Sequence, residues 1–282
     1  MFTINDNREF QEQIKLLIFC GKQLLGAGEY PLAKECFQKI CDADTDTHEN
    51  MELFRINMEA QLSIITCDHT EITSPGNFDI APMRMSRLLG CLTSTRDVLD
   101  VLLALPDKDQ EQFAWLILNG CKLIYTIGHP LLWLDCSKYV HESFIYASLC
   151  MDAVINLCTT RHLNLRMKIG SSAFSSLVTH SSFEEVYSFV QYVVLKVSEL
   201  RQREELDPPL QDKINDELMR AETDIAVMKT VMEFWQNPDS LDLNSLQNPF
   251  PDTSLSALPN ASAAFAEKCL MECIRTQELT AS

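Results

Sequence analysis

The sequence carries little positive charge. Its 282 residues include 23 lysines and arginines against 40 aspartates and glutamates, which gives a net charge of −17. A surface of this sign repels nucleic-acid phosphates and anionic lipid headgroups. We therefore expect neither nucleic acid nor a membrane as a partner.

Motifs that carry chemistry are also scarce. The closest glycine pair, Gly26 and Gly28, sits at a helix turn without the preceding strand that a dinucleotide site needs. Cys269 and Cys273 lie one helical turn apart, with no nearby histidine to complete a metal site. Residues 67–69, Cys-Asp-His, resemble a nucleophile beside a base, but sequence neighbours on a helix do not face each other. We predict no catalytic, metal-binding or cofactor-binding residues, and a protein that is not an enzyme.

The cysteines do not form the pattern of a disulfide framework. There are 11 of them, an odd number, scattered through apolar stretches of helical length. The opening residues, MFTINDNREFQEQ, lack the basic start and apolar core of a signal peptide. These features favour a reducing compartment, and we predict a cytoplasmic location.

The apolar residues come in helix-length blocks, which predicts an all-α fold. Expected helices include residues 49–67, 85–105 with a possible break at 93–95, 136–158 and 161–178. Residues 113–134 are almost uncharged and about long enough to cross a bilayer. We predict a buried helix there instead, because Lys122 lies near its middle and Gly128 and Pro130 interrupt it.

The stretch GKQLLGAGEYPLAKECFQKI, residues 21–40, predicts a helical hairpin. Pro31 suits the first turn of the second helix, where a missing N–H costs nothing. Gly21 and Ala33 would allow two helices to approach closely, and Phe37 would fill the gap, as in the spacing of tetratricopeptide repeats. The predicted fold is thus an array of antiparallel helical hairpins, degenerate and tetratricopeptide-like; a plain hairpin with coincidental small residues is the alternative.

Two further helices are predicted after residue 181. Ser182 and Glu185 form a capping box ahead of a valine-rich face whose period is 3.6 and not 2. After residues 208–209, Pro-Pro, apolar residues recur at heptad spacing from Ile214 to Trp235. This seam could pack inside the chain's own bundle or receive a partner's helix.

The composition divides the chain into three parts. Residues 1–235 are predicted as the helical-hairpin domain, residues 236–260 as a polar, proline-containing linker or arm, and residues 261–282 as a short C-terminal helix. Exposed methionine and aromatic side chains are common anchors of protein interfaces. The candidate partner-binding residues are Met228, Met232, Trp235, Phe250 and Phe265.

Three strings of the sequence resemble the N-terminal region of the cilia- and flagella-associated protein 54 family. They are FAWLILNGCKLIYTI (113–127), YASLCMDAVINLCTTRHLNLR (146–166) and VLKVSELRQREEL (194–206), and the likeness covers roughly residues 10–232. The resemblance implies a structural segment of a projection on the central-pair microtubules of the axoneme, within the cilium or flagellum cytoskeleton. It further implies a requirement for projection assembly and for ciliary and sperm motility.

The same resemblance implies that the partners are other central-apparatus proteins. Because tubulin surfaces are themselves acidic, we expect microtubule association to be indirect. The alternative is a general cytosolic tetratricopeptide-like adaptor that binds a partner peptide or helix. Such adaptors usually hold carboxylates with a basic clamp, and the basic residues near the first hairpin are Lys15, Lys22, Lys34 and Lys39.

Overall fold

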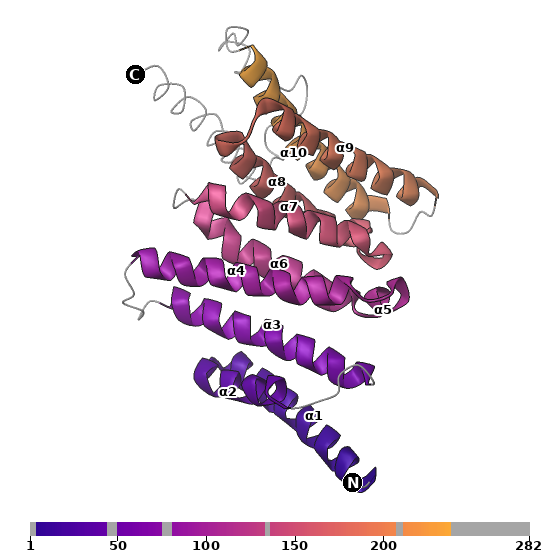
Figure 1. The fold of residues 1–282 in the computed structure, drawn as a ribbon. Coiled ribbons are helices and arrows are strands. Elements are labelled where there is room, and N and C mark those ends of the chain that lie inside the picture. The colour runs from indigo at the N-terminus through magenta and orange to yellow at the C-terminus, as the bar shows by residue number, and fades with distance from the viewer. Residues whose placement is uncertain (1–3, 44–49, 75–80, 133–135, 207–210, 238–282) are drawn as a thin grey trace. The chain divides into compact units, whose positions relative to one another are not determined.

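The computed structural model describes residues 4–43, 50–74, 81–132, 136–206 and 211–237. These residues form ten α-helices and two short 3-10 helices, and the helices pack as antiparallel neighbours, which confirms the all-α prediction over these ranges (Figure 1). The helices are α1 (Ile4–Ala27), α2 (Tyr30–Cys41), α3 (Met51–Thr73), α4 (Ala81–Leu103), α5 (Asp107–Gln112), α6 (Ala114–Leu132), α7 (Ser137–Ala153), α8 (Leu163–His180), α9 (Phe183–Leu206) and α10 (Gln211–Gln236), with η1 (Ile155–Leu157) and η2 (Thr160–His162) between α7 and α8.

The chain divides into two compact units, Met1–Cys158 and Thr159–Ser282. We call them unit 1 and unit 2 and describe each separately. The predicted linker, residues 236–260, lies beyond the described ranges except for its first two residues, and the predicted C-terminal helix, residues 261–282, lies entirely outside them.

Unit 1 begins with the predicted hairpin. The turn after α1 places Gly28 at φ +83°, a left-handed conformation that glycine adopts without a steric cost. The Gly28 N–H donates to the Leu25 carbonyl over 3.1 Å, and the Glu29 N–H donates to the Leu24 carbonyl over 2.9 Å. This is a Schellman ending, and Pro31 lies in the first turn of α2 as predicted.

Close approach of α1 and α2 depends on Gly21. An added Cβ at this position would lie 2.5 Å from Cε1 of Phe37, so no other residue fits without movement of the ring. Phe37 and Ala33 are both fully buried in the core that α1, α2 and α3 share. The predicted roles of these three residues in packing are confirmed.

Helices α3 and α4 are longer than the sequence patterns suggest. The Asn50 side chain caps α3 by accepting from the N–H groups of Glu52 and Leu53, over 3.0 and 3.2 Å. The helix then continues to Thr73, beyond the predicted end at residue 67. The possible break at residues 93–95 is wrong: α4 is continuous there, because buried Thr95 satisfies its hydroxyl on the Cys91 carbonyl at 2.7 Å.

Helix α6 forms the centre of the unit 1 core, as predicted for a buried helix. It packs against α3, α4 and α7. Glycines permit two of these contacts. A Cβ added at Gly120 would lie 2.6 Å from Leu99 Cδ2, and a Cβ added at Gly128 would lie 2.8 Å from Phe144 Cζ. The expected interruption at Pro130 is wrong, since Pro130 lies inside the last turn of α6 and the helix continues to Leu132. Within the described ranges, no helix combines the length and hydropathy required to span a membrane.

Helix α7 ends at Ala153, earlier than the predicted residue 158. The Glu111 carboxylate accepts hydrogen bonds from the backbone N–H groups of Ile155 and Asn156, over 2.5 and 3.0 Å. A side chain more than forty residues away in the sequence thus holds the backbone in η1 instead of a continuing helix.

Unit 2 contains α8, α9 and α10, each in contact with the other two. The capping box ahead of α9 is present: the Ser182 N–H donates to Glu185 Oε2 over 3.0 Å, and the Glu185 N–H donates to Ser182 Oγ over 3.4 Å. The predicted apolar face of α9 is buried apart from Val194, which is partly exposed. The heptad seam of α10 is buried from Leu218 to Met232 against α8 and α9, so it packs within its own chain.

Candidate functional site

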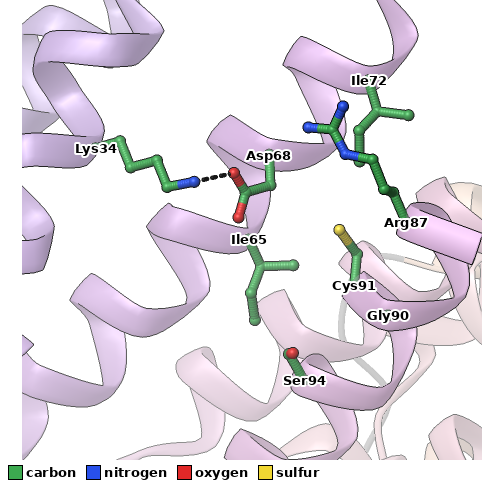
Figure 2. A pocket seen from close by; sticks show the side chains of 8 residues that line it. All are labelled: Lys34, Ile65, Asp68, Ile72, Arg87, Gly90, Cys91 and Ser94. Atoms are coloured by element: carbon green, nitrogen blue, oxygen red, sulfur yellow. Dashed lines mark hydrogen bonds and ion pairs between the residues drawn. The ribbon is translucent and has the colours of Figure 1, made fainter. Parts of the chain in front are cut away.

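A hollow in unit 1 lies between α2, α3 and α4, and we call it the α3 groove. Its volume is about 330 Å³, and it is open to solvent. Figure 2 shows Lys34 reaching in from α2, while Arg87 and Cys91 extend from α4. The lining residues are Lys34, Ile65, Asp68, Ile72, Arg87, Gly90, Cys91 and Ser94.

The floor of the α3 groove is apolar. Ile65 and Ile72 of α3 and Cys91 of α4 are all buried. Gly90 and Ser94, one turn apart on α4, are exposed, and an added Cβ at Gly90 would meet no atom within 4 Å. Because these two residues are small, the groove is shallow along α4, and an apolar side chain from another molecule could reach its floor.

The rim of the groove carries paired charges. The Lys34 ammonium donates to Asp68 Oδ1 in an ion pair between α2 and α3, drawn as the dashed line in Figure 2. Arg87 Nη2 lies 3.6 Å from Glu71 Oε1. Partly exposed pairs of this kind contribute about 0–1 kcal/mol each. These four groups therefore contribute no net charge to the rim.

The thiols near the groove are poor nucleophiles. The pKa values of Cys67 and Cys91 are both raised to about 11, chiefly by burial and in addition by the Asp68 carboxylate. Burial also lowers the pKa of His69. A thiol with such a pKa stays protonated near pH 7, and the thiolate is the reactive form. Residues 67–69 therefore lack the activated thiol that a cysteine nucleophile requires.

Within the described residues, no group of three or more His, Cys, Asp or Glu side chains could hold a metal ion. Cys269 and Cys273, one turn apart in the sequence, lie outside the described residues.

The candidate partner-binding residues fall in different surroundings. Met228 and Met232 are 1% and 5% exposed and belong to the core of unit 2. Trp235 is 37% exposed, so of these three it presents the most surface to a partner. Phe250 and Phe265 lie outside the described residues.

Trp235 belongs to a cluster of rings that we call the aromatic platform: Phe183, Tyr187 and Trp235. The Phe183 ring lies 5.8 Å from the Trp235 ring, edge to face, and 6.1 Å from the Tyr187 ring, stacked, measured between centroids. Tyr187 is 49% exposed. The platform joins the start of α9 to the end of α10 within unit 2.

Sequence reasoning missed most of both surfaces. The α3 groove depends on Arg87, Gly90 and Ser94, which the sequence analysis did not single out. Gly90 inside a helix, four residues before Ser94, is a signal that could have indicated a helix face with small side chains. For the platform, Phe183 and Tyr187 lie four positions apart, a spacing that places them on one helix face.

Together these features define a class: over the described residues this is an all-helical protein with an apolar-floored groove in unit 1 and exposed aromatic rings in unit 2. The sequence model of the family described as "Cilia- and flagella-associated protein 54" matches residues 52–275. The chain belongs to this family, in its N-terminal region, as the resemblance implied.

Two curated relatives match over part of the chain. The human cilia- and flagella-associated protein 54 is 26% identical over 168 residues, which cover 60% of this chain and 4% of the human protein. The mouse protein of the same name is 31% identical over 116 residues, which cover 41% of this chain and 4% of the mouse protein. The chain thus matches only a small fraction of the length of these relatives.

Proposed function

We propose that this chain is a non-catalytic scaffold segment of the ciliary or flagellar axoneme, in a projection of the central-pair microtubules. It would be required for assembly of the projection and for ciliary and sperm motility. The observation that carries the proposal is the family match over residues 52–275. The relatives' shared name refers to cilia and flagella. Placement in a projection of the central pair goes beyond that name and is part of our proposal.

The packing of unit 1 supports a scaffold role. Helix α1 contacts α2, α2 contacts α3 and α3 contacts α4, and the first pair approaches through Gly21 and Phe37. We propose that these helices form a degenerate tetratricopeptide-like array, in which each hairpin buries its apolar face on the next. The α3 groove would then be the surface on which another polypeptide docks.

Charge indicates which partners to expect. With a net charge of −17, direct electrostatic docking on acidic tubulin would be unfavourable. We propose that the partners are other central-apparatus proteins and that microtubule association is indirect. The location would then be the axoneme, within the cytoplasm and cytoskeleton of the cilium.

Tagged imaging tests this proposal in cells with motile cilia. The tagged chain is expected along the central pair, and its removal is expected to abolish one projection in electron tomograms and to alter the beat. Signal on the outer doublets, or none in the axoneme with intact projections after removal, would contradict the proposal.

The alternative function is a cytosolic adaptor that binds a partner peptide or helix, and the α3 groove is the observation that favours it. The basic cluster such an adaptor would use is largely paired: Lys22 with Glu59, Lys34 with Asp68, and Lys15 with Glu12 at 3.6 Å. A carboxylate ligand would have to displace these partners. A diffuse cytosolic signal in the imaging experiment, with partners recovered from cells without cilia, would favour the adaptor.

A further inference from the structure

The aromatic platform of unit 2 combines exposed rings with a border of negative charge. Glu184 lies three positions before Tyr187, so the two side chains share a face of α9. Glu184 and Glu185 both lie in the first turn of α9. Glu233 is exposed in the last turn of α10, and that turn contains no basic residue. The two first-turn carboxylates outweigh the roughly half positive charge of a helix N-terminus.

Exposed rings next to carboxylates favour one kind of ligand group. The face of an aromatic ring attracts a cation, and arginine uses this contact more often than lysine because its planar guanidinium also stacks. A neighbouring carboxylate adds a charged hydrogen-bond acceptor for the same group. Glu184 can play this part, since Glu185 already accepts the Ser182 N–H in the capping box.

We propose that the aromatic platform is the docking site for an arginine-bearing segment of a partner protein. The guanidinium would stack on Tyr187 or Trp235 and donate to the Glu184 carboxylate. This inference rests on the proposed scaffold function, because it names the chemistry of a partner that a scaffold would hold. The acidic surface would then be complementary in charge to a basic partner.

Residues 236–267 of the chain itself fit the platform less well by charge. From residue 236 to residue 267 the sequence contains no lysine or arginine, and it contains Asp239, Asp242, Asp252 and Glu267. A segment of this composition would bring like charge toward Glu184. Charge complementarity therefore favours a basic partner over this stretch of the chain itself.

The test uses the full chain and two synthetic peptides. One is an alanine-based helical peptide with several arginines on one face, and the other has citrulline at each arginine position, which keeps the shape and removes the charge. Fluorescence anisotropy at physiological salt measures both affinities. We expect the arginine peptide to bind about tenfold more tightly, and Tyr187→Ala and Trp235→Ala each to weaken it about threefold to tenfold.

Trp115→Ala is the matched control. Trp115 is 38% exposed, close to the 37% of Trp235, but it lies on α6 in unit 1. Its removal should leave the affinity unchanged, and Tyr187→Phe should retain binding because the ring remains. Circular dichroism establishes that each variant is folded. Tyr187→Ala keeps the test decisive if Trp235→Ala disturbs the neighbouring core.

Several results would overturn the proposal. Equal affinity for the two peptides would show that no guanidinium is recognised, as when another part of the chain covers the rings. Equal loss with Trp115→Ala and Trp235→Ala would show unspecific attraction to an acidic protein. A dimer in sedimentation that Trp235→Ala dissociates would make a second copy the occupant. Axonemal location of the unaltered chain tests the scaffold proposal separately, so the two can fail independently.

Discussion

The first hairpin and the α9–α10 pair join antiparallel helices in different ways. Between α1 and α2 the contact depends on an absent side chain, because the Phe37 ring occupies the space where a Cβ of Gly21 would be. Between α9 and α10 side chains meet at the surface, with Phe183 against Trp235 at one end of the pair and Arg201 Nη1 2.6 Å from Glu222 Oε1 farther along it. The first contact is buried, whereas these side-chain contacts of the second pair are partly exposed.

The difference separates residues that stabilise the fold from residues that remain accessible to a partner. A ring that is fully buried against a neighbouring backbone cannot be altered without a cavity or a clash. Rings at the exposed ends of a helix pair contribute less to stability and remain accessible to a partner. The comparison therefore predicts large stability effects at Gly21 and Phe37, and small ones at the aromatic platform.

Phe37→Ala should give the largest effect. Removal of a fully buried ring leaves a cavity, and the free energy of unfolding should fall by about 3–5 kcal/mol. Tyr187→Ala, at a half-exposed ring of the platform, should cost less than about 1 kcal/mol. Urea unfolding followed by circular dichroism measures both. Similar losses for the two variants would break the comparison.

Replacement of Gly21 in α1 and of Gly90 in α4 by alanine should change the free energy of unfolding in opposite directions. Gly21→Ala drives a Cβ into Phe37 and should cost about 1–3 kcal/mol, reduced by a gain of up to about 1 kcal/mol in helix propensity. Gly90→Ala meets no atom and should stabilise by about 0.5–1 kcal/mol. The same unfolding measurement checks both. Stabilisation by Gly21→Ala would show that the close contact is loose in solution.

Much of this packing could be predicted from the sequence, because it depends on local patterns. Gly21, Ala33 and Phe37 have a spacing that fixes which side chains meet across a hairpin. Ser182 and Glu185 likewise predict a helix start from their spacing alone. Patterns of this kind succeed because each residue's partner is fixed by local backbone geometry.

Features that depend on distant residues were not predicted. The end of α7 is set by Glu111, whose hydrogen bonds to residues 155 and 156 no local pattern reveals. The α3 groove requires Lys34 and Arg87 to lie on either side of Asp68, which follows from the packing of three helices. The heptad seam left open whether Met228 and Met232, both candidate partner-binding residues, would pack within the chain or against a partner's helix, and the structure buries both against α8 and α9.

Loss of the α9 cap should have an intermediate effect and sharpen the comparison within unit 2. Ser182→Ala removes the acceptor for the Glu185 N–H and should cost about 1 kcal/mol. Ser182→Thr keeps a hydroxyl and should retain most of that stability. Thermal unfolding measures the difference. A cost as large as that of Phe37→Ala would mean that the end of the α9–α10 pair, and not its buried face, holds the two helices together.

Asp224→Asn should give the smallest effect, and its sign should depend on pH. Burial raises the pKa of Asp224 on α10 above its ordinary value of 3.8, so the folded state holds the proton more tightly than the unfolded state does. Stability from this group is then fully present below about pH 4 and is lost as pH rises through the folded pKa. The neutral amide avoids that loss, so the variant should be more stable than the wild type at pH 7 and equal to it near pH 3. Thermal unfolding across this range measures the crossover, and a variant less stable at pH 7 would show that the Asp224 carboxylate has a stabilising partner in unit 2.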